Sequence, residues 1–432
     1  MQQTQWYKSK TPWYDPPPSF FRDKPVKNQN VIVIGAGLAG AAVAHRLAEL
    51  EFEVSVIDSA GSVAQGASGN LAGALHPLVT ADWNLRSQWY WEGFQATLSR
   101  LKPWLASNEI EGELKGLMHL AVDHKSYQRM HQALKRVAHL ATFTHWCEAE
   151  RAAQIMGGRC LHPGLFFPQA GWFNPPSIVN RCLNHSNISI ELGFNVSSVI
   201  PTSDDLFNQK DTKAWLVKTD KKDFEADRVV LATGGLSGLN ETFGLSIRPV
   251  KGQVSALSPS NQAWSLNCAV AHQGYSTPAC KGYAVTGATF EAPDMKPEPS
   301  EKANMQNLAM VQASLPDWLT DVPLKNPGRV SFRPTTPDHL PIIGAVADSE
   351  WMQTAYLSQS PSHAPYRFPP QRYRAGLYVS NGHGARGLMS VFLAAEIIAA
   401  QIMGNNLPID AKLLAANHPA RFAIRNWQRK PQ

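Results

Sequence analysis

The sequence predicts an α/β fold with two domains, one a Rossmann-like α/β domain and the other built on mainly antiparallel strands. Three observations support this prediction. A β-branched strand leads into a glycine-rich turn and a helix near residue 35, a second such unit lies near residue 382, and many short alternating strands lie between them. With 432 residues, the chain is long enough for two or three domain-sized cores.

The first unit has the spacing of a Rossmann-like dinucleotide site. An apolar strand over 31–34 precedes Gly35, Gly37 and Gly40, which form the pattern GxGxxG. A helix is expected over 38–50, and a second strand over 54–57 ends at Asp58, where a ribose-binding carboxylate belongs. The glycines permit the turn, the approach of a pyrophosphate and the packing of helix on strand. An ordinary glycine turn is the alternative, and the unit does not separate NAD from FAD.

A second glycine turn predicts that another helix N-terminus faces the same site. A strand over 376–380 leads into the glycine turn 381–387 and an alanine-rich helix over 388–403. The buried strand 227–235, which contains Thr233 and Gly234, is expected to end beside the first strand. Ligands of open α/β sheets bind in the crevice at such strand ends, and helix N-termini favour anionic groups.

The segments between these units predict a substrate domain. Short alternating strands are expected over 245–330, with an insert over 292–316. Helices are expected over 83–105 and 126–139, and another follows the cap Asn174, with Pro175 at its first position. The expected domain boundaries are 30–105, 170–240 and 330–416 for the cofactor domain and 106–169 and 241–329 for the substrate domain.

The composition is that of a soluble globular enzyme, with 44% hydrophobic and 17% charged residues. Lys and Arg exceed Asp and Glu by 40 to 34, which permits an anionic partner such as RNA but does not require one. The five cysteines form no CxxC pair and no metal-ligand spacing, so buried core thiols in a reducing compartment are expected. No signal peptide and no membrane-spanning segment is expected, and a cytoplasmic location follows.

The two ends of the chain differ in composition from the body. Residues 1–29 are rich in proline and aromatic residues, which predicts an extended or polyproline segment lying along the folded body. Residues 417–432 are predicted to form a basic aromatic tail suited to RNA, with solvated C-terminal charges as the alternative. The basic residues of this tail are Arg421, Arg425, Arg429 and Lys430, around Phe422 and Trp427.

Together these motifs resemble the FAD-dependent amine oxidoreductases of the D-amino acid oxidase and glycine oxidase superfamily. The shared elements are 35–40, Asp58, 67–69, 232–234, Arg333 with Pro334, and 382–384. Five segments are similar, more narrowly, to the C-terminal FAD-dependent half of the bifunctional tRNA 5-methylaminomethyl-2-thiouridine biosynthesis proteins: 66–70, 73–77, 168–172, 248–253 and 333–341. Residues 11–14 resemble the linker before that half. With no methyltransferase half in the sequence, the resemblance implies a stand-alone oxidoreductase and a separate SAM-dependent methyltransferase.

The resemblance implies a tRNA substrate whose wobble uridine, in the anticodon region, carries a carboxymethylaminomethyl group. In the family, oxidation of the glycine-like arm gives an imine that hydrolyses to aminomethyluridine and glyoxylate. Arg333 is expected to grip the carboxylate with its planar guanidinium, and a structural salt bridge is the alternative. His76, His339 and His383 are candidate bases by residue type only, and a structural role fits each of them better.

The resemblance also implies non-covalent FAD, since the C-terminal turn holds no cysteine. The expected cofactor-binding residues are Gly35, Gly37, Gly40, Asp58, Ser68, Gly69, Asn70, Val196, Thr233, Gly234, Gly382, Gly384, Arg386 and Gly387. Gly382, Gly384, Arg386 and Gly387 are expected to direct N–H groups toward the flavin, while the loop 65–70 could instead be a surface turn. Two other functions stay open: a glycine- or sarcosine-type oxidase of free amines, and a flavin-free RNA-binding or scaffolding protein.

Overall fold

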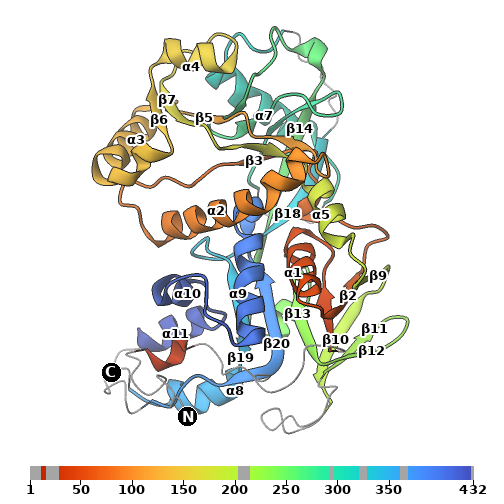
Figure 1. Ribbon diagram of the computed structural model, residues 1–432. Helices are drawn as coiled ribbons and strands as arrows, with labels where there is room; N and C mark the ends of the chain where they lie inside the picture. Colours follow the sequence, from red (N-terminus) through yellow and green to blue (C-terminus); the bar gives the residue numbers. More distant parts are fainter. Residues whose placement is uncertain are drawn as a thin grey trace.

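Two sheets organise the chain, one in the lower body and one in the upper body of Figure 1. The computed structural model describes residues 11–15, 29–202, 215–291, 296–320, 328–360 and 368–429. The predicted polyproline positions 16–18 and 25, residue 214 of an expected strand and Lys430 of the predicted tail lie outside these residues. None of the helices in the described residues is both long enough and apolar enough to cross a bilayer.

The lower body is a six-stranded sheet in the order β19-β20-β13-β1-β2-β9. All neighbouring pairs are parallel except β19 and β20. Its strands are β1 (Asn30–Ile34), β2 (Glu53–Asp58), β9 (Ile188–Leu192), β13 (Arg228–Leu231), β19 (Ile342–Ala347) and β20 (Tyr373–Asn381). The sheet confirms the predicted Rossmann-like α/β domain.

Alternate residues of β1 pack on opposite faces of this sheet, as expected for a strand buried on both sides. Val31 and Val33 share one cluster with helices α1 (Leu38–Glu49) and α9 (Val391–Met403). Ile32 and Ile34 share another with Trp215 and Val217 of a small antiparallel sheet. That sheet contains β10 (Val196–Pro201), β11 (Trp215–Thr219) and β12 (Phe224–Ala226).

The upper body is an eight-stranded sheet in the order β18-β14-β17-β16-β15-β5-β7-β6. Only the pair β15 and β5 is parallel, which confirms the mainly antiparallel prediction. Its strands are β5 (Leu117–Leu120), β6 (His145–Cys147), β7 (Gly164–Phe167), β14 (Arg248–Leu257), β15 (Ala269–Ala271), β16 (Tyr275–Ser276), β17 (Ala284–Gly287) and β18 (Gly328–Thr335). Helix α7 (Glu301–Ser314), inside the predicted insert, packs on this sheet through Leu308 and Val311.

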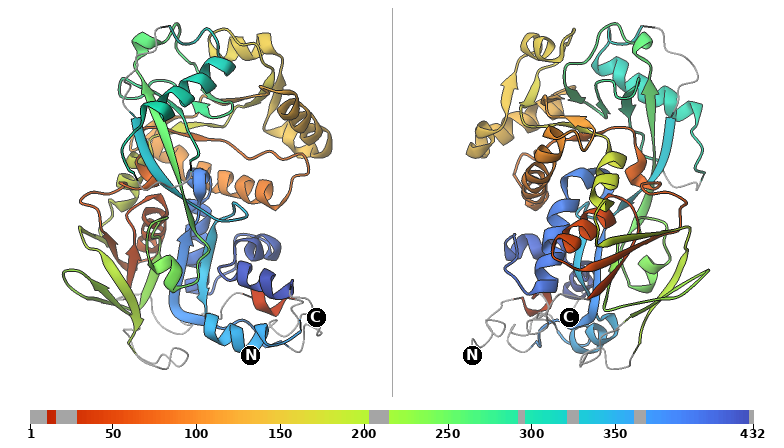
Figure 2. Two further views of the ribbon diagram at one scale, coloured as in Figure 1. Left: turned by 180° about the vertical axis from the view of Figure 1, so that it is seen from behind. Right: turned by 45° about the vertical axis from the view of Figure 1, so that its right-hand side comes forward.

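The long strands β14 and β18 continue past the domain boundary that was expected at residue 330. They pair from Arg248 with Thr335 to Ser255 with Gly328, so β18 stays in the eight-stranded sheet along its whole length. Figure 2 shows them from behind, running toward the junction of the two bodies. The remaining elements are β3 (Gly73–Leu75), β4 (Gly112–Glu113), β8 (Gly171–Phe173), α2 (Leu85–Ala106), α3 (His124–Arg136), α4 (Ala149–Met156), α5 (Pro175–Leu183, capped by Asn174), α6 (Leu239–Thr242), α8 (Ser349–Met352), α10 (Ala411–Asn417), α11 (Arg421–Gln428) and the short turns η2 (Pro12–Tyr14), η3 (Ala67–Gly69), η4 (Ala138–Thr142), η5 (Pro259–Asn261), η6 (Gln353–Leu357) and η8 (Gly384–Met389).

The predicted basic tail is wrong for residues 421–428, which form the docked helix α11. Arg421 is fully buried and donates hydrogen bonds to both carboxylate oxygens of Asp338, at 3.0 and 2.8 Å. Arg425 donates to the same carboxylate at 2.5 Å. Trp427 packs against Trp13, with ring centroids 5.3 Å apart. These arginines therefore bind a carboxylate that lies far away in the sequence. Near the other end of the chain, Pro12–Tyr14 forms a 3-10 turn rather than the expected extended segment.

Candidate active site

A cavity of about 1110 Å³ lies where the two bodies meet. The six-stranded sheet contributes the carboxyl ends of β1, β2 and β13, and the eight-stranded sheet contributes β5, β16 and β18. Of the predicted site residues, the cavity is lined by Gly35, Gly37, Asp58, Ser68, Asn70, Val196, Thr233, Gly234, Arg333, His76, His383, Gly384, Arg386 and Gly387. The predicted residues that do not line it are Gly40, Gly69, Gly382 and His339.

The turn between β1 and α1 explains each glycine of the first motif. Gly35 has φ +117°, and a Cβ there would lie 2.3 Å from the Ala232 carbonyl oxygen. A Cβ on Gly40 would lie 1.9 Å from the Gly35 carbonyl oxygen, so this residue permits helix packing without reaching the cavity. The hydrogen bond from the Ala41 N–H to the Gly37 carbonyl begins the helical pattern of α1, so the N–H groups that precede Ala41 have no carbonyl partner within the helix. The cavity thus meets a helix N-terminus that favours an anion.

Asp58 organises this turn from the end of β2. Its Oδ2 accepts the Ala36 N–H at 2.7 Å, and its Oδ1 accepts the Ala60 N–H at 2.8 Å. A carboxylate has about four acceptor positions, so two bonds leave capacity for a hydroxyl donor. Ser68 has a similar structural role, since its Oγ accepts the Leu38 N–H at 2.9 Å. The predicted ribose contact of Asp58 is compatible with this geometry and stays a prediction.

Arg329, which sequence reasoning missed, holds the loop 65–70 in place. Its guanidinium donates to the carbonyl oxygens of Gln65 and Gly66 at 2.6 and 2.7 Å and to Asn70 Oδ1 at 3.3 Å. Gly69 faces this arginine, because a Cβ there would lie 2.4 Å from its Nη2. The structure thus gives Gly69 a packing role against Arg329, and its expected contact with the cofactor stays a prediction. No local pattern pointed to Arg329, which meets the loop only through the tertiary fold.

The second glycine turn differs from its prediction in two ways. Gly382 donates its N–H to Asn381 Oδ1 at 2.8 Å, and Arg386 donates its N–H to the His383 carbonyl at 3.1 Å. Both N–H groups are thus used within the turn and are not directed at a ligand. The expected helix 388–403 is also interrupted, since the 3-10 turn Gly384–Met389 ends at Ser390 before α9 begins.

Hydrogen-bonded amides join the ends of the two central strands beneath the cavity. Asn381 Nδ2 donates to Thr233 Oγ1 at 3.1 Å and to the Gly234 carbonyl at 3.0 Å. Thr233 Oγ1 donates in turn to Asn240 Oδ1 at 3.0 Å. Asn240 and Asn381 were not predicted, although Asn381 directly precedes the glycine turn. They fix the register of β13 and β20 where both face the cavity.

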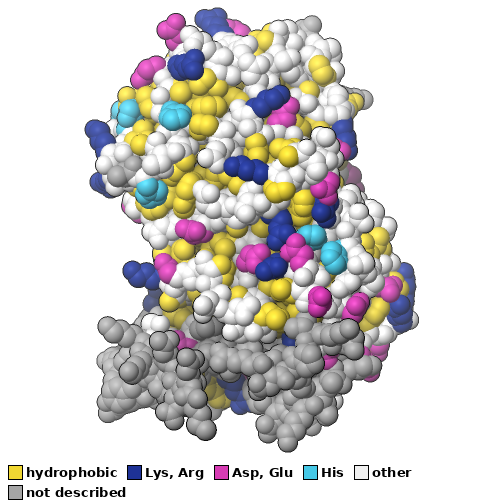
Figure 3. Space-filling view, viewed as in Figure 1, with side chains coloured by type: hydrophobic (Ala, Val, Ile, Leu, Met, Phe, Trp, Pro, Cys, Tyr) yellow, Lys and Arg dark blue, Asp and Glu magenta, His cyan; other side chains and the backbone are white. Residues whose placement is uncertain are grey.

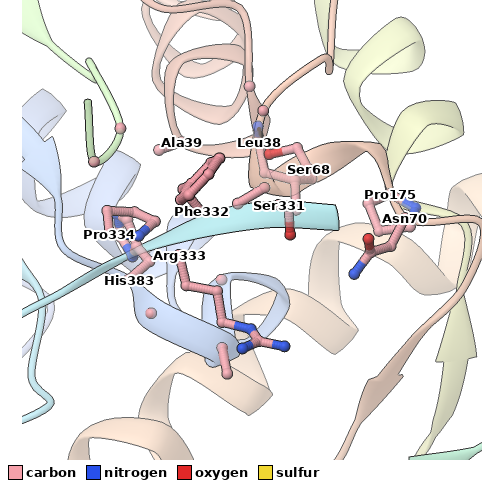
Figure 4. A pocket seen from close by; sticks show the side chains of 18 of the residues that line it. Leu38, Ala39, Ser68, Asn70, Pro175, Ser331, Phe332, Arg333, Pro334 and His383 are labelled. Carbon is pink, nitrogen blue, oxygen red and sulfur yellow. Dashed lines mark hydrogen bonds between the residues drawn. The ribbon is translucent and has the colours of Figure 1, made fainter. Parts of the chain in front are cut away.

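Arg333 is 7% exposed and lies beside the cavity on β18. Its Nη1 donates to the Thr289 carbonyl at 2.9 Å, and its guanidinium carbon lies 4.3 Å from the centroid of the Phe290 ring. Among the described residues no carboxylate forms an ion pair with it, so the alternative of a structural salt bridge has no support there. Figure 4 shows that Arg333 and its neighbour Phe332 leave opposite faces of the strand.

Neutral side chains line the cavity that Arg333 borders. Burial raises the pKa of Tyr275 to about 12, and its O–H donates to the Ala72 carbonyl at 3.0 Å. Burial and the charge of Arg129 lower the pKa of His119 to about 3, and burial lowers the pKa of His272 to about 4. Burial, followed by the charge of Arg386, lowers the pKa of His76 well below its ordinary value. These three cavity histidines are therefore uncharged at pH 7.

His383 has the structural role that was expected for it. Its ring nitrogens bond Ser380 Oγ at 3.1 Å and Ser390 Oγ at 2.8 Å, and burial lowers its pKa to about 3. His339 lies on the exposed loop after β18, away from the cavity. Arg386 keeps its side chain in the lining, 5.5 Å from the Tyr90 ring. The cavity therefore holds two guanidinium groups that no described carboxylate neutralises, which suits an anionic substrate.

A mainly parallel sheet with a glycine turn at each of two helices, facing an antiparallel sheet across one cavity, is the architecture of a two-domain dinucleotide-dependent oxidoreductase. The chain belongs to the family of FAD dependent oxidoreductases, whose model matches residues 30–401. It is 49% identical to the tRNA 5-methylaminomethyl-2-thiouridine biosynthesis bifunctional protein MnmC of Hydrogenovibrio crunogenus, over 98% of this chain and 62% of that protein. It is 31% identical to the protein of the same name from Pseudomonas syringae pv. tomato, over 94% of this chain and 61% of that protein.

Solved structures share the fold at lower sequence identity. Glycine oxidase from Geobacillus kaustophilus matches with a TM-score of 0.71 and 20% identity, over 91% of this chain and 99% of that chain. L-proline dehydrogenase from P. horikoshii matches with a TM-score of 0.70 and 17% identity, over 93% of this chain and 99% of that chain. The chain spans about three fifths of the length of the curated relatives described above, which are 62% and 61% covered.

The cavity fits FAD on the evidence of its own residues. Gly35 and Gly37 leave no side chain between the backbone and a pyrophosphate, and Asp58 has acceptor capacity for a ribose. No cysteine is among the described residues that line the cavity, and non-covalent binding stays a prediction.

Proposed function

We propose that this chain oxidatively removes the carboxymethyl group from carboxymethylaminomethyl(-2-thio)uridine at the tRNA wobble position, giving aminomethyl(-2-thio)uridine. The observation that carries the proposal is the 49% identity, over 98% of the chain, to a bifunctional tRNA 5-methylaminomethyl-2-thiouridine biosynthesis protein. The buried Arg333 beside the cavity supports it, since a substrate with a glycine-like arm presents a carboxylate.

Arg333 would bind that carboxylate and so fix the adjacent CH2 group. One of its N–H groups bonds the Thr289 carbonyl, and the others stay available to an anion. Bound FAD supplies the two-electron acceptor for hydride loss from this carbon. As the nitrogen loses its proton, a C=N bond forms, and addition of water then breaks the C–N bond to release glyoxylate. The neutral cavity histidines leave Arg333 and Arg386 as the charges that orient the substrate.

Mass spectrometry of wobble nucleosides tests the proposal. FAD-loaded protein is incubated with carboxymethylaminomethylated tRNA, and we expect aminomethyluridine and glyoxylate in equal amounts. Parallel reactions contain free glycine or sarcosine in place of the tRNA. Turnover of these amines with an unchanged wobble nucleoside would replace the proposal with the alternative of a small-amine oxidase.

We also propose that a separate SAM-dependent methyltransferase acts on the product. The relatives are bifunctional proteins whose name specifies a methylaminomethyl group, whereas the oxidation proposed here ends at an aminomethyl group. Adding SAM alone to the reaction should leave the aminomethyl nucleoside unmethylated. Formation of methylaminomethyluridine by this chain would contradict this part of the proposal.

A further inference from the structure

Helix α3 presents one basic face to solvent. Lys125, Arg129, Lys135 and Arg136 are all exposed, whereas Ser126, Met130 and Ala133 on the opposite side are buried. The helix contains no Asp or Glu. None of the four cations forms an ion pair with any described carboxylate. The cap Asp123 is an acid beside this face, and the charges of Arg129 and Lys125 act on it. Four cations against this one acid leave a net positive face, which favours a polyanionic partner.

This face belongs to the part of the structure that forms the cavity. Strand β5 carries the cavity residue His119, and only three residues separate the end of that strand from the start of α3. The charge of Arg129 acts on His119 and on Arg386, both of which line the cavity. Figure 3 shows Lys, Arg and His side chains gathered at the left edge of the molecule, where Figure 1 places α3.

Aromatic rings flank the same helix. Tyr127 is 39% exposed, and its ring centroid lies 4.3 Å from that of His131 and 5.3 Å from that of Trp146. Tyr127 lies two positions from both Lys125 and Arg129, so its ring leaves α3 on a different side from these cations and could stack an unpaired base only beside the basic face.

We infer that the exposed face of α3 is the docking surface for the phosphate backbone of an RNA, placed to present a nucleotide to the cavity. The inference depends on the proposed function only for the identity of that RNA as the tRNA substrate. Two cations of the predicted basic tail, Arg421 and Arg425, bind Asp338 and so are not free to form such a surface.

The test uses the FAD-loaded variant K125Q/K135Q/R136Q, with Arg129 kept because its charge acts on the cavity. Binding of unmodified tRNA is measured by filter binding from low to high salt. Each lost phosphate contact should flatten the log-log salt slope by about 0.7 to 0.9, so the triple variant should lose about 2 to 3 units of slope. The matched control is K218Q/K302Q/K412Q, which removes three exposed cations from β11, α7 and α10. The control and the charge-preserving variant K125R/K135R/R136K should both keep the wild-type slope.

A wild-type slope in K125Q/K135Q/R136Q, or an equal loss in the control, would overturn the inference. Retained flavin absorbance shows that the variants are folded. Since unmodified tRNA is bound without turnover, this assay does not depend on the proposed reaction. If the protein leaves the wobble nucleoside unchanged but the salt slope of its tRNA binding still depends on α3, the proposed function is refuted and the docking surface is supported.

Discussion

Replacing Arg333 with alanine removes the group proposed to hold the substrate carboxylate. A hydrogen bond to a charged group contributes about 1.5 to 3 kcal/mol, so two such bonds correspond to about 3 to 6 kcal/mol. Because every 1.4 kcal/mol is tenfold, kcat/KM should fall by about 10² to 10⁴. Arg333→Lys keeps the charge but loses the planar pair of donors and the contact at 4.3 Å with Phe290, and it should give an intermediate loss.

Arg329 provides the matched control, because it lies on the same strand four residues earlier and has a different partner. Its guanidinium bonds the loop 65–70, so Arg329→Ala should weaken flavin retention. Flavin absorbance after gel filtration and turnover of the modified tRNA are measured for both variants. Arg333→Ala should keep the flavin and lose turnover. Normal turnover in that variant, or loss of flavin equal to that of Arg329→Ala, would refute the carboxylate role.

Three further predictions concern the glycine turn, the C-terminal helix and the cavity wall. Gly40→Ala places a methyl group 1.9 Å from the Gly35 carbonyl, so a thermal melt should show a loss of about 1 to 3 kcal/mol and gel filtration a loss of flavin. Although burial opposes it, hydrogen bonding to Arg421 lowers the pKa of Asp338 to about 2, below the unfolded value of about 3.9. The resulting stability, of the order of 2 kcal/mol, is present above about pH 4 and is lost as the pH falls toward 2. In urea unfolding, the free energy of unfolding of the wild-type chain should therefore exceed that of Asp338→Asn by an amount that shrinks below pH 4. A difference between the two chains that stays constant with pH would contradict this prediction. Phe290→Ala removes the ring beside Arg333 and should raise KM for the tRNA several-fold with flavin retained, whereas an unchanged KM would argue against that contact.

The features that could be predicted from the sequence are those fixed by local spacing. Gly35, Gly37 and Asp58 meet in one turn because a strand, a short helix and a second strand leave few other arrangements. The helix cap Asn174 could also be predicted from local sequence, because its Oδ1 accepts the N–H of Ser177, only three residues later.

The errors arise where a local pattern competes with distant partners. Arg421 looked like a tail residue because its carboxylate partner, Asp338, lies 83 positions away. The N–H groups of Gly382 and Arg386 were expected to face the flavin, but they donate instead to acceptors within the turn, Asn381 Oδ1 and the His383 carbonyl. Arg329 could not be predicted, because its contacts with the loop 65–70 exist only once β18 has paired with β14.

The two sheets contribute different groups to the site, and this difference bears on which sheet determines the substrate specificity. The glycine turns belong to β1 and β20, whereas Arg333, Tyr275 and His119 belong to β18, β16 and β5 of the eight-stranded sheet. Structures with the names glycine oxidase and L-proline dehydrogenase share the whole fold at only 20% and 17% identity, so the architecture alone does not specify a substrate. A cavity that binds a glycine-like group would accept that group either as a free small molecule or attached to a larger one. If the substrate is a tRNA, as proposed, its selection requires surfaces outside the cavity, and α3, which follows β5 directly in the chain, is placed to supply one.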